Sequence, residues 1–71
     1  MSEDFLAEFG ATVRELRKRK SLSQEKLALE MGMDLTSINE IENGRRNPTL
    51  RTIVRIARVL GVRPAELLSE L

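Results

Sequence analysis

The sequence contains no cysteine, histidine, tryptophan or tyrosine. Without cysteine no disulfide can form, and the usual thiolate and imidazole metal ligands are missing. Catalytic groups of the Ser-His-Asp or Cys-His kind are excluded for the same reason. Carboxylate-only catalysis and an oxygen-ligand metal site stay open. However, the acids are scattered over surface-type helix positions and no glycine-rich phosphate loop occurs, so we expect no enzyme, no metal and no cofactor.

Long apolar runs are also absent. No stretch approaches the ~20 apolar residues of a membrane span, so we expect no membrane partner. Residues 1–10 lack the basic start and apolar run of a signal sequence, and we expect a cytoplasmic protein. The 71 residues are expected to form one domain, 1–71. A core of that size stabilises a fold only weakly, which makes association of two copies the expected further source of stability.

Charge is nearly balanced, at +1 for 12 basic and 11 acidic residues, but it is unevenly placed. Residues 43–63 hold six arginines and no acid, and residues 14–20 hold five basic residues and one acid. The stretch between them, 21–42, holds one lysine and five acids. Two basic segments can neutralise phosphates. They can equally be ordinary solvated helix faces, and charge alone does not separate these readings.

Apolar residues recur at three- and four-residue steps almost throughout, which predicts an all-α fold. We expect five helices, at about 3–20, 24–31, 35–43, 49–60 and 64–69. Ser23 and Asp34 are suited to cap the second and third helices. Glycines follow the second, third and fourth helices, and Pro64 suits the first position of the fifth. On the fourth helix the expected inner face consists of Leu50, Ile53, Ile56, Ala57 and Leu60.

The stretch from Ser23 to Gly44 has the pattern of a helix-turn-helix, about 24–43. Ala28 is small enough for two helices to cross closely, and Gly32 allows a sharp turn four residues later. Ile38 and Ile41 lie three residues apart and would anchor the second helix of the motif to the core. The opposite face is then expected to carry the polar side chains of Thr36, Ser37, Asn39 and Glu40.

From Phe9 to Leu68 the sequence resembles the phage-repressor/Cro (Xre) type of helix-turn-helix. The matching motifs, spaced without a gap, are Val13-Arg14-Glu15-Leu16-Arg17, Leu22-Ser23-Gln24-Glu25, Leu27-Ala28, Gly32, Ile38-Asn39-Glu40-Ile41-Glu42-Asn43-Gly44, Arg46-Asn47-Pro48-Thr49-Leu50 and Ile56-Ala57-Arg58-Val59-Leu60-Gly61-Val62. The resemblance implies a compact five-helix bundle of the lambda-repressor-like type, whose third helix lies in the major groove. Within this family the restriction–modification controllers are most similar. Phage or plasmid repressors and antitoxins remain alternatives, and Ser37 departs from the tyrosine that controllers often have there.

The resemblance also implies roles for single residues. The base-reading residues would be Leu35, Thr36, Asn39 and Glu40. Thr36 and Asn39 could hydrogen-bond to base edges, Leu35 could make apolar contact, and Glu40 could accept from cytosine N4. The residues expected at phosphates are Arg17, Gln24, Arg46 and Asn47. Arg17 and Glu42 would form an ion pair that orients the helices. The remaining basic residues that we considered, expected to be solvated, are Arg14, Lys18, Lys20, Arg55 and Arg58.

Apolar residues near the end of the chain exceed what one short helix can bury. We expect a homodimer whose interface contains Val59, Val62, Leu67, Leu68 and Leu71. The simpler alternative is that Leu67 and Leu68 complete the core of a monomer. The expected function is a dimeric transcription regulator that binds a palindrome in double-stranded DNA and, if it is an activator, contacts RNA polymerase. A protein-interaction module on the same fold is the alternative, weakly favoured by Glu40 and Leu35 on the reading face.

Overall fold

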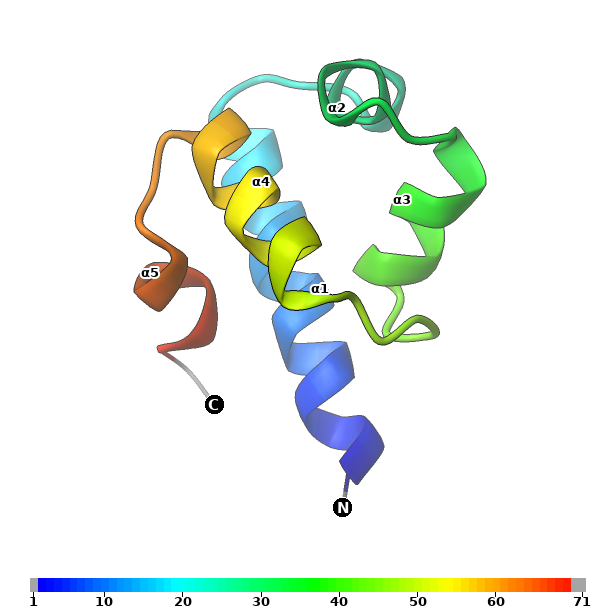
Figure 1. Cartoon of the computed structure of the whole chain (residues 1–71), viewed down its shortest axis with the longest axis vertical. Helices are drawn as coiled ribbons and strands as arrows, with labels where there is room; N and C mark the ends of the chain where they lie inside the picture. The colour runs from blue at the N-terminus through cyan, green and yellow to red at the C-terminus, as the bar shows by residue number, and fades with distance from the viewer. Residues whose placement is uncertain (1, 70–71) are drawn as a thin grey trace.

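The computed structural model describes residues 2–69, and the side chains of residues 5–69. The chain forms five helices, shown in Figure 1: α1 (Ser2–Arg19), α2 (Gln24–Met31), α3 (Leu35–Glu42), α4 (Leu50–Leu60) and α5 (Pro64–Leu68). No strand occurs within residues 2–69. The expected all-α five-helix fold is therefore confirmed, with helix ends within about two residues of the expected ones, which is the usual scatter of helix assignment.

Local capping explains where the two central helices begin and end. The Ser23 hydroxyl accepts from the Lys26 backbone N–H at 3.0 Å, and Asp34 Oδ1 accepts from the Ser37 N–H at 2.7 Å. Gly32 ends α2 in the left-handed conformation, at φ 66°. Each cap satisfies a backbone group that the helix itself leaves without a partner. The lengths of α2 and α3 are thus set by the sequence around them.

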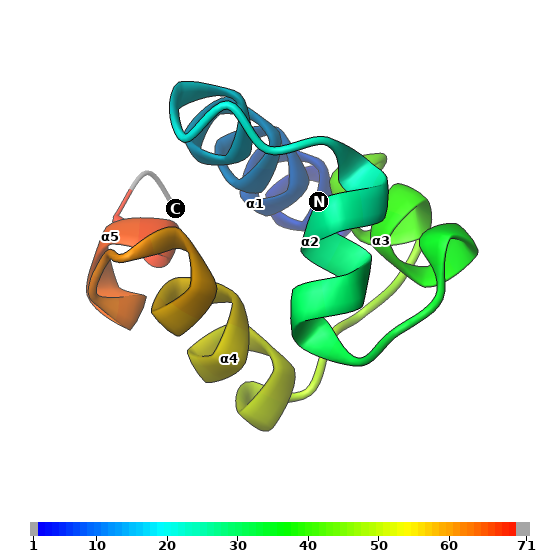
Figure 2. The same cartoon turned by 90° about the horizontal axis from the view of Figure 1, so that it is seen from above.

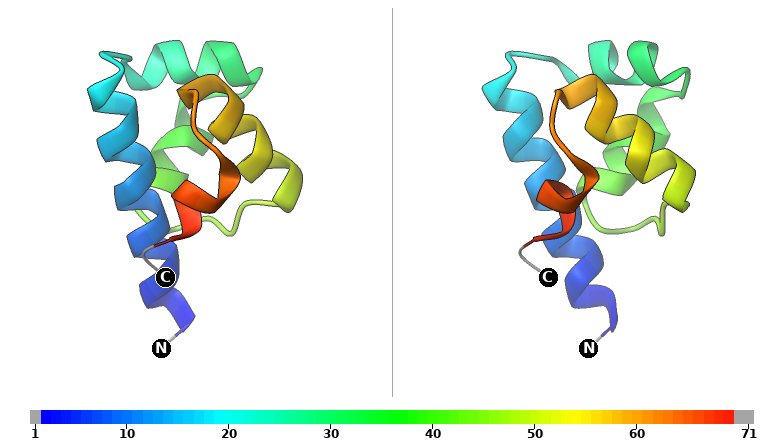
Figure 3. Two further views of the ribbon diagram at one scale, coloured as in Figure 1. Left: turned by 90° about the vertical axis from the view of Figure 1, so that its left-hand side faces the viewer. Right: turned by 60° about the vertical axis from the view of Figure 1, so that its left-hand side comes forward.

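The long helix α1 packs against α3, α4 and α5, whereas α2 packs against α3 and α4 (Figures 1 and 3). Seen from above, α2 and α3 lie on one side and α5 lies on the other, with α4 between them (Figure 2). The side chains that meet in the centre are apolar. They are Phe9, Val13, Leu27, Ala28, Met31, Ile38, Ile41, Ile56, Ala57, Leu60 and Leu67. Burial of this surface is the main force that holds the helices together.

Leu50 is a correction to the expected inner face of α4. It is 73% exposed, although Ile56, Ala57 and Leu60 are buried as expected. Leu50 is the first residue of α4 and shares an outward-facing surface with Arg51 and Val54. Three-residue spacing placed it with the core, but the helix reaches the core only from Ile53 onward. In the part of the chain that the structure describes, no helix is both long and apolar enough to cross a membrane.

Candidate nucleic-acid interface

Helices α2 and α3 form a tight helix-turn-helix. Ala28 is buried where the two helices cross, and its carbonyl accepts from the Met33 N–H at 2.9 Å across the turn. Gly32 takes the positive φ that this turn requires, a conformation that is costly for residues with a Cβ. Ala28 is therefore buried and Gly32 makes the turn, as their positions in the sequence indicated.

Helix α3 has one buried and one accessible side. Ile38 and Ile41 face the core, whereas Leu35 and Thr36 are exposed and Asn39 is half-buried. Ser37 is a correction, because it is only 8% exposed and does not lie on the accessible side. It precedes Ile41 by four residues, and this spacing puts both on the inner face. The accessible side consists of Leu35, Thr36, Asn39 and Glu40.

Behind this accessible side lies a buried carboxylate, that of Glu42. Arg17 Nε donates to Glu42 Oε2 at 2.6 Å, and Arg17 Nη2 donates to Oε1 at 3.1 Å. Gln24 Nε2 donates to the same Oε1 at 2.9 Å. These bonds join α1, α2 and the end of α3, so they fix how α3 sits on the rest of the domain. The two residues that the resemblance paired, Arg17 and Glu42, do lie together.

The environment of Glu42 keeps it charged. Burial acts to raise the pKa of this carboxyl, because a low-dielectric surrounding disfavours the ion. The hydrogen bonds from Arg17 and Gln24, together with the charge of Arg17, outweigh burial and hold the pKa below its ordinary value. No buried side-chain nitrogen or oxygen in the described part of the chain lacks a partner. The cluster is therefore a satisfied ionic network.

The network continues to the accessible side of α3. Asn39 Nδ2 lies 3.5 Å from Gln24 Oε1, and Asn43 Nδ2 donates to Asn39 Oδ1 at 3.2 Å. Arg14 Nη2 donates to Asn43 Oδ1 at 3.0 Å, and Arg14 Nε lies 3.5 Å from Glu42 Oε1. Arg14 is therefore not simply solvated, which corrects that expectation. Arg55 is exposed, as expected, and it also donates to the Met31 carbonyl.

Arg17 does not fit the expected role at a phosphate. Its side chain is 9% exposed, and its remaining bond goes to the Leu22 carbonyl at 2.7 Å from Nη1. Because this guanidinium donates three hydrogen bonds inside the protein, it holds neighbouring segments together. Gln24 is half-buried, and both ends of its amide already have partners. Arg17 is thus corrected to a residue that holds the helices.

Arg46 and Asn47 lie exposed in the loop between α3 and α4. Arg46 does not extend freely, because its Nε and Nη2 donate to Glu40 Oε1 at 3.1 and 3.0 Å. The pKa of Asp34 is lowered mainly by the hydrogen bonds from Ser37, while burial acts to raise it. The charge of Arg46 lowers this pKa further. The structure therefore brings one expected base-reading residue and one expected phosphate-binding residue together.

Gly10 is a packing position behind α3 that we did not identify from the sequence. A Cβ built there would lie 2.3 Å from the Ile41 carbonyl oxygen and 2.6 Å from that of Glu42. Only a residue without a side chain lets α1 approach the end of α3 so closely. A glycine in the middle of an otherwise regular helix is the signal that could have revealed this contact, since it is unfavourable there without a packing reason.

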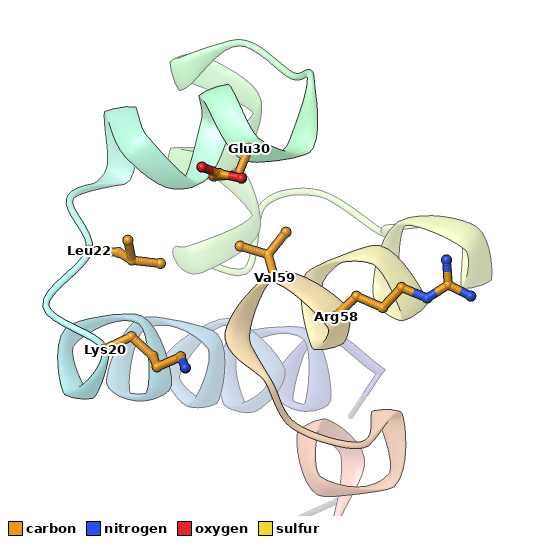
Figure 4. Close-up of a pocket in the computed structure, with 5 residues that line it drawn as sticks. All are labelled: Lys20, Leu22, Glu30, Arg58 and Val59. Carbon is orange, nitrogen blue, oxygen red and sulfur yellow. The ribbon is translucent and has the colours of Figure 1, made fainter.

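The described apolar residues among those expected at a dimer interface differ in exposure and direction. Leu67 is a correction: it is 1% exposed and belongs to the core, as the simpler alternative held. Val59 points across a groove toward Leu22 of the α1–α2 loop and Glu30 of α2, away from α5 (Figure 4). Leu68 remains exposed and Val62 is half-buried, while Leu71 lies outside the described residues.

Metal chemistry has no support in the part of the chain that is described. No group of three histidine, cysteine, aspartate or glutamate side chains there could hold a metal ion. The acids near α3 instead pair with arginines, as Glu42 and Glu40 do. The chemistry available at this surface is hydrogen bonding, apolar contact and charge pairing.

Comparison with known proteins agrees with this geometry. The family model described as "Helix-turn-helix" (HTH_3) matches residues 13–67. The control protein C.BamHI of Bacillus amyloliquefaciens is 48% identical over 62 residues, which are 86% of this chain and 76% of that protein. The control protein C.MunI of a Mycoplasma species is 39% identical over 69 residues, covering 96% and 93% of the two chains.

A solved structure gives the same result in three dimensions. The restriction-modification controller protein C.AhdI from Aeromonas hydrophila matches with a TM-score of 0.85 and 44% identity, over 87% of this chain and 94% of that one. The expected family is thus confirmed by sequence and by fold. The chain belongs to the HTH_3 (Xre) helix-turn-helix family and is a DNA-binding transcription regulator, not an enzyme.

Proposed function

We propose that this regulator is a restriction–modification controller that binds a palindromic operator as a homodimer, with α3 in the major groove. One observation carries the binding mode: the accessible side of α3 is held from behind by the buried Arg17–Glu42 pair. Rigid support of this kind lets a short helix present its side chains in a fixed register. The sub-type is supported by the names of C.BamHI, C.MunI and C.AhdI, which this chain resembles along most of their length.

The proposed base contacts come from the accessible side of α3. Thr36 offers a hydroxyl and a methyl group, and Leu35 offers an apolar surface for a thymine methyl. Asn39 already bonds Gln24 and Asn43 at its amide, so these neighbours orient it toward the groove. Glu40 can only accept, and cytosine N4 is a donor that it could take.

Phosphate contacts are proposed on either side of α3. Arg46 and Asn47 are exposed in the loop that follows the helix. Gln24 is the first residue of α2, where free backbone N–H groups favour an anion. Arg17 is left out of this set because its side chain is buried. We propose that it acts on DNA only through Glu42 and the position of α3.

For the dimer we propose an interface around the exposed side of α5, with Leu68 at its centre and with a contribution from Val62 in the loop before α5. Leu68 lines a surface hollow together with Phe5 and Pro48, and Leu68 and Phe5 are exposed apolar side chains. Helix α5 lies on the opposite side of the domain from α3 (Figure 2). A two-fold axis near α5 would place the two α3 helices far apart, as a spacing of about 34 Å on one face of DNA requires.

The remaining parts of the proposal concern the setting in which the protein acts. Residues 1–71 would act as one DNA-binding domain. Its bacterial relatives and its DNA ligand favour action in the cytoplasm. If the bound dimer activates a promoter, it would contact RNA polymerase from beside the operator.

Selection of bound sequences from a random duplex library tests the function. We expect a palindrome whose half-sites are about one DNA turn, 10 base pairs, apart or a multiple of it. Retention on nonspecific duplex should fall steeply with salt, because bound phosphates release counterions. A protein that is not retained at low salt and selects no sequence would instead be an interaction module.

Sedimentation equilibrium tests the dimer separately. Leu68→Lys should produce monomers and weaken operator binding while the helix content is kept. Leu29→Lys is the matched control, because Leu29 is also an exposed leucine but lies on α2. A wild-type mass that stays monomeric up to micromolar concentration would contradict the proposed dimer.

A further inference from the structure

The contact between Glu40 and Arg46 has an unusual distribution of bonds. Both donors of Arg46, Nε and Nη2, end on the same oxygen, Glu40 Oε1. Among the described residues, no bond to Glu40 Oε2 occurs, so that oxygen can still accept from a ligand. Glu40 follows Thr36 by four residues on α3 and therefore lies on the side proposed to face the bases.

Fold stability does not explain this pair. Its side chains are 43% and 38% exposed, and an exposed ion pair contributes about 0–1 kcal/mol because water and salt screen it. The pair also does not connect distant parts of the chain, because the two residues are six positions apart. A role toward the ligand is a better explanation for a paired carboxylate on this surface.

Two facts limit what a carboxylate can do near DNA. The phosphates repel its charge, and it can form a hydrogen bond only with a base edge that carries a donor. In the major groove, cytosine N4–H₂ has an acceptor on one side only, guanine O6, whereas adenine N6–H₂ lies between two acceptors, adenine N7 and thymine O4. A carboxylate that is neutralised and held in place would thus select cytosine.

We propose that Glu40 and Arg46 act as one unit that reads cytosine, an inference that rests on the proposed DNA-binding mode of α3. Arg46 holds Glu40 through Oε1 and cancels its charge near the phosphates. Glu40 then accepts from cytosine N4 with Oε2. Arg46 is therefore a positioning residue for base recognition, in addition to any phosphate contact that its free Nη1 makes.

Base preferences selected by variants test this unit, and the operator sequence need not be determined first. Wild-type protein, Glu40→Gln and Arg46→Ala are each used to select duplexes from the same random library. Glu40→Gln should lower the preference for cytosine at one position of each half-site by about tenfold to a hundredfold, the value of one hydrogen bond to a charged acceptor. Adenine should gain there, because a glutamine amide can both donate to N7 and accept from N6.

Arg46→Ala should lower the cytosine preference at that same position, and the double variant should resemble Glu40→Gln there. The matched control pair is Glu15 and Arg19, an exposed ion pair on α1. Glu15→Gln and Arg19→Ala should leave every base preference unchanged.

Two results would overturn the inference alone. In the first, the wild type selects a palindrome and Glu40→Gln changes none of its positions. In the second, Arg46→Ala weakens binding but leaves the Glu40-dependent position intact. A wild-type protein that selects no sequence would overturn the proposed binding mode, and this inference with it.

Discussion

Two arginine–glutamate pairs have their glutamates on helix α3, and they differ mainly in exposure. In the first, Arg17 and Glu42 have side chains that are 9% and 0% exposed. In the second, Arg46 and Glu40 have side chains that are 43% and 38% exposed. Bond lengths are similar, at 2.6 and 3.1 Å in the first pair and 3.1 and 3.0 Å in the second.

The difference shows that burial, more than geometry, decides what an ion pair does. A buried pair cannot lose one partner without leaving an uncompensated charge, so it locks the helices that carry it. An exposed pair can be rearranged at little cost, so it remains available to a ligand. Helix α3 thus carries a fixed pair on its inner side and an adaptable pair toward the solvent.

Breaking the buried pair should have the largest effect. Arg17→Met would leave the Glu42 carboxylate buried with weaker partners, and we expect a loss of about 3–5 kcal/mol in the free energy of unfolding. For a domain of this size that is a large share of the total. Urea unfolding followed by circular dichroism measures it, and a variant already unfolded in buffer would agree with the prediction.

The double variant Arg17→Met, Glu42→Leu is the control for this explanation. Removing both charges leaves no buried ion, so the double variant should be more stable than Arg17→Met alone. A double variant that is less stable than Arg17→Met, because the two losses in the free energy of unfolding add, would show that packing, and not the charge, matters at this position.

The fixed side of α3 should also be sensitive, to a smaller extent, to a single added carbon at Gly10. Gly10→Ala places a Cβ against the backbone carbonyls of Ile41 and Glu42, and we expect overpacking to cost about 1–3 kcal/mol. In an open helix the same substitution would stabilise by about 1 kcal/mol, so the sign of the change is decisive. A thermal or urea midpoint that rises in Gly10→Ala would contradict the close approach of α1 and α3.

The accessible side should respond in binding and not in stability. Thr36→Ala should weaken operator binding by about 1–3 kcal/mol, because one base contact is lost. Thr36 is exposed, so the unfolding midpoint should hardly change. Thr12→Ala on α1 is the matched control and should bind normally. Unchanged affinity of Thr36→Ala at fixed salt would remove Thr36 from the reading surface.

The fold could be predicted because its signals are local. Ser23, Asp34 and Gly32 act within a few residues of their own positions, so capping and turn chemistry can be read directly from the sequence. Apolar spacing then indicated which sides of most helices face inward. Of the four residues proposed at the bases, each is at least partly accessible, and that they contact bases stays a prediction.

The expectations that were wrong depend on contacts between distant segments. Leu67 was placed by counting apolar residues and Leu50 by its three-residue spacing, but only the packing of helices decides which of them reaches the core. Arg17 was expected near a phosphate because the family resemblance implied it, and the sequence does not show that its side chain is buried. The burial of Ser37 and the close contact at Gly10, which was missed, depend on which side of one helix packs against another. Periodicity gives the direction of a side chain around its own helix and nothing about its neighbours.

The exposed pair should give the opposite outcome to the buried one when its arginine is removed. Arg46→Ala should change the free energy of unfolding by no more than about 1 kcal/mol, because the pair is screened by solvent. Its effect should lie in binding, where the slope of log affinity against log salt should flatten by about one unit per subunit if a phosphate contact is lost. A stability loss as large as that of Arg17→Met would erase the distinction between the two pairs.

The smallest expected effect is a pH dependence that belongs to the buried pair. Burial acts to raise the pKa of Glu42, but the bonds from Arg17 and Gln24 hold it below the ordinary value of 4.5. The unfolded chain therefore takes up this proton at a higher pH than the folded chain does. The stabilisation from Glu42 is complete above pH 4.5 and is lost as the pH falls through the pKa of the folded state.

Glu42→Gln isolates this contribution from that of the other acids. It keeps the side-chain size but cannot carry the charge, so it should be less stable than the wild type at neutral pH, where Arg17 has lost its counter-ion. As the pH falls below 4.5 and then through the lowered pKa of the folded state, the wild-type carboxylate is protonated too, and the difference in urea midpoint between the two proteins should narrow. A difference that stays constant well below that pH would mean that the Glu42 charge does not stabilise the fold. The buried pair would then have lost the property that separates it from Arg46 and Glu40.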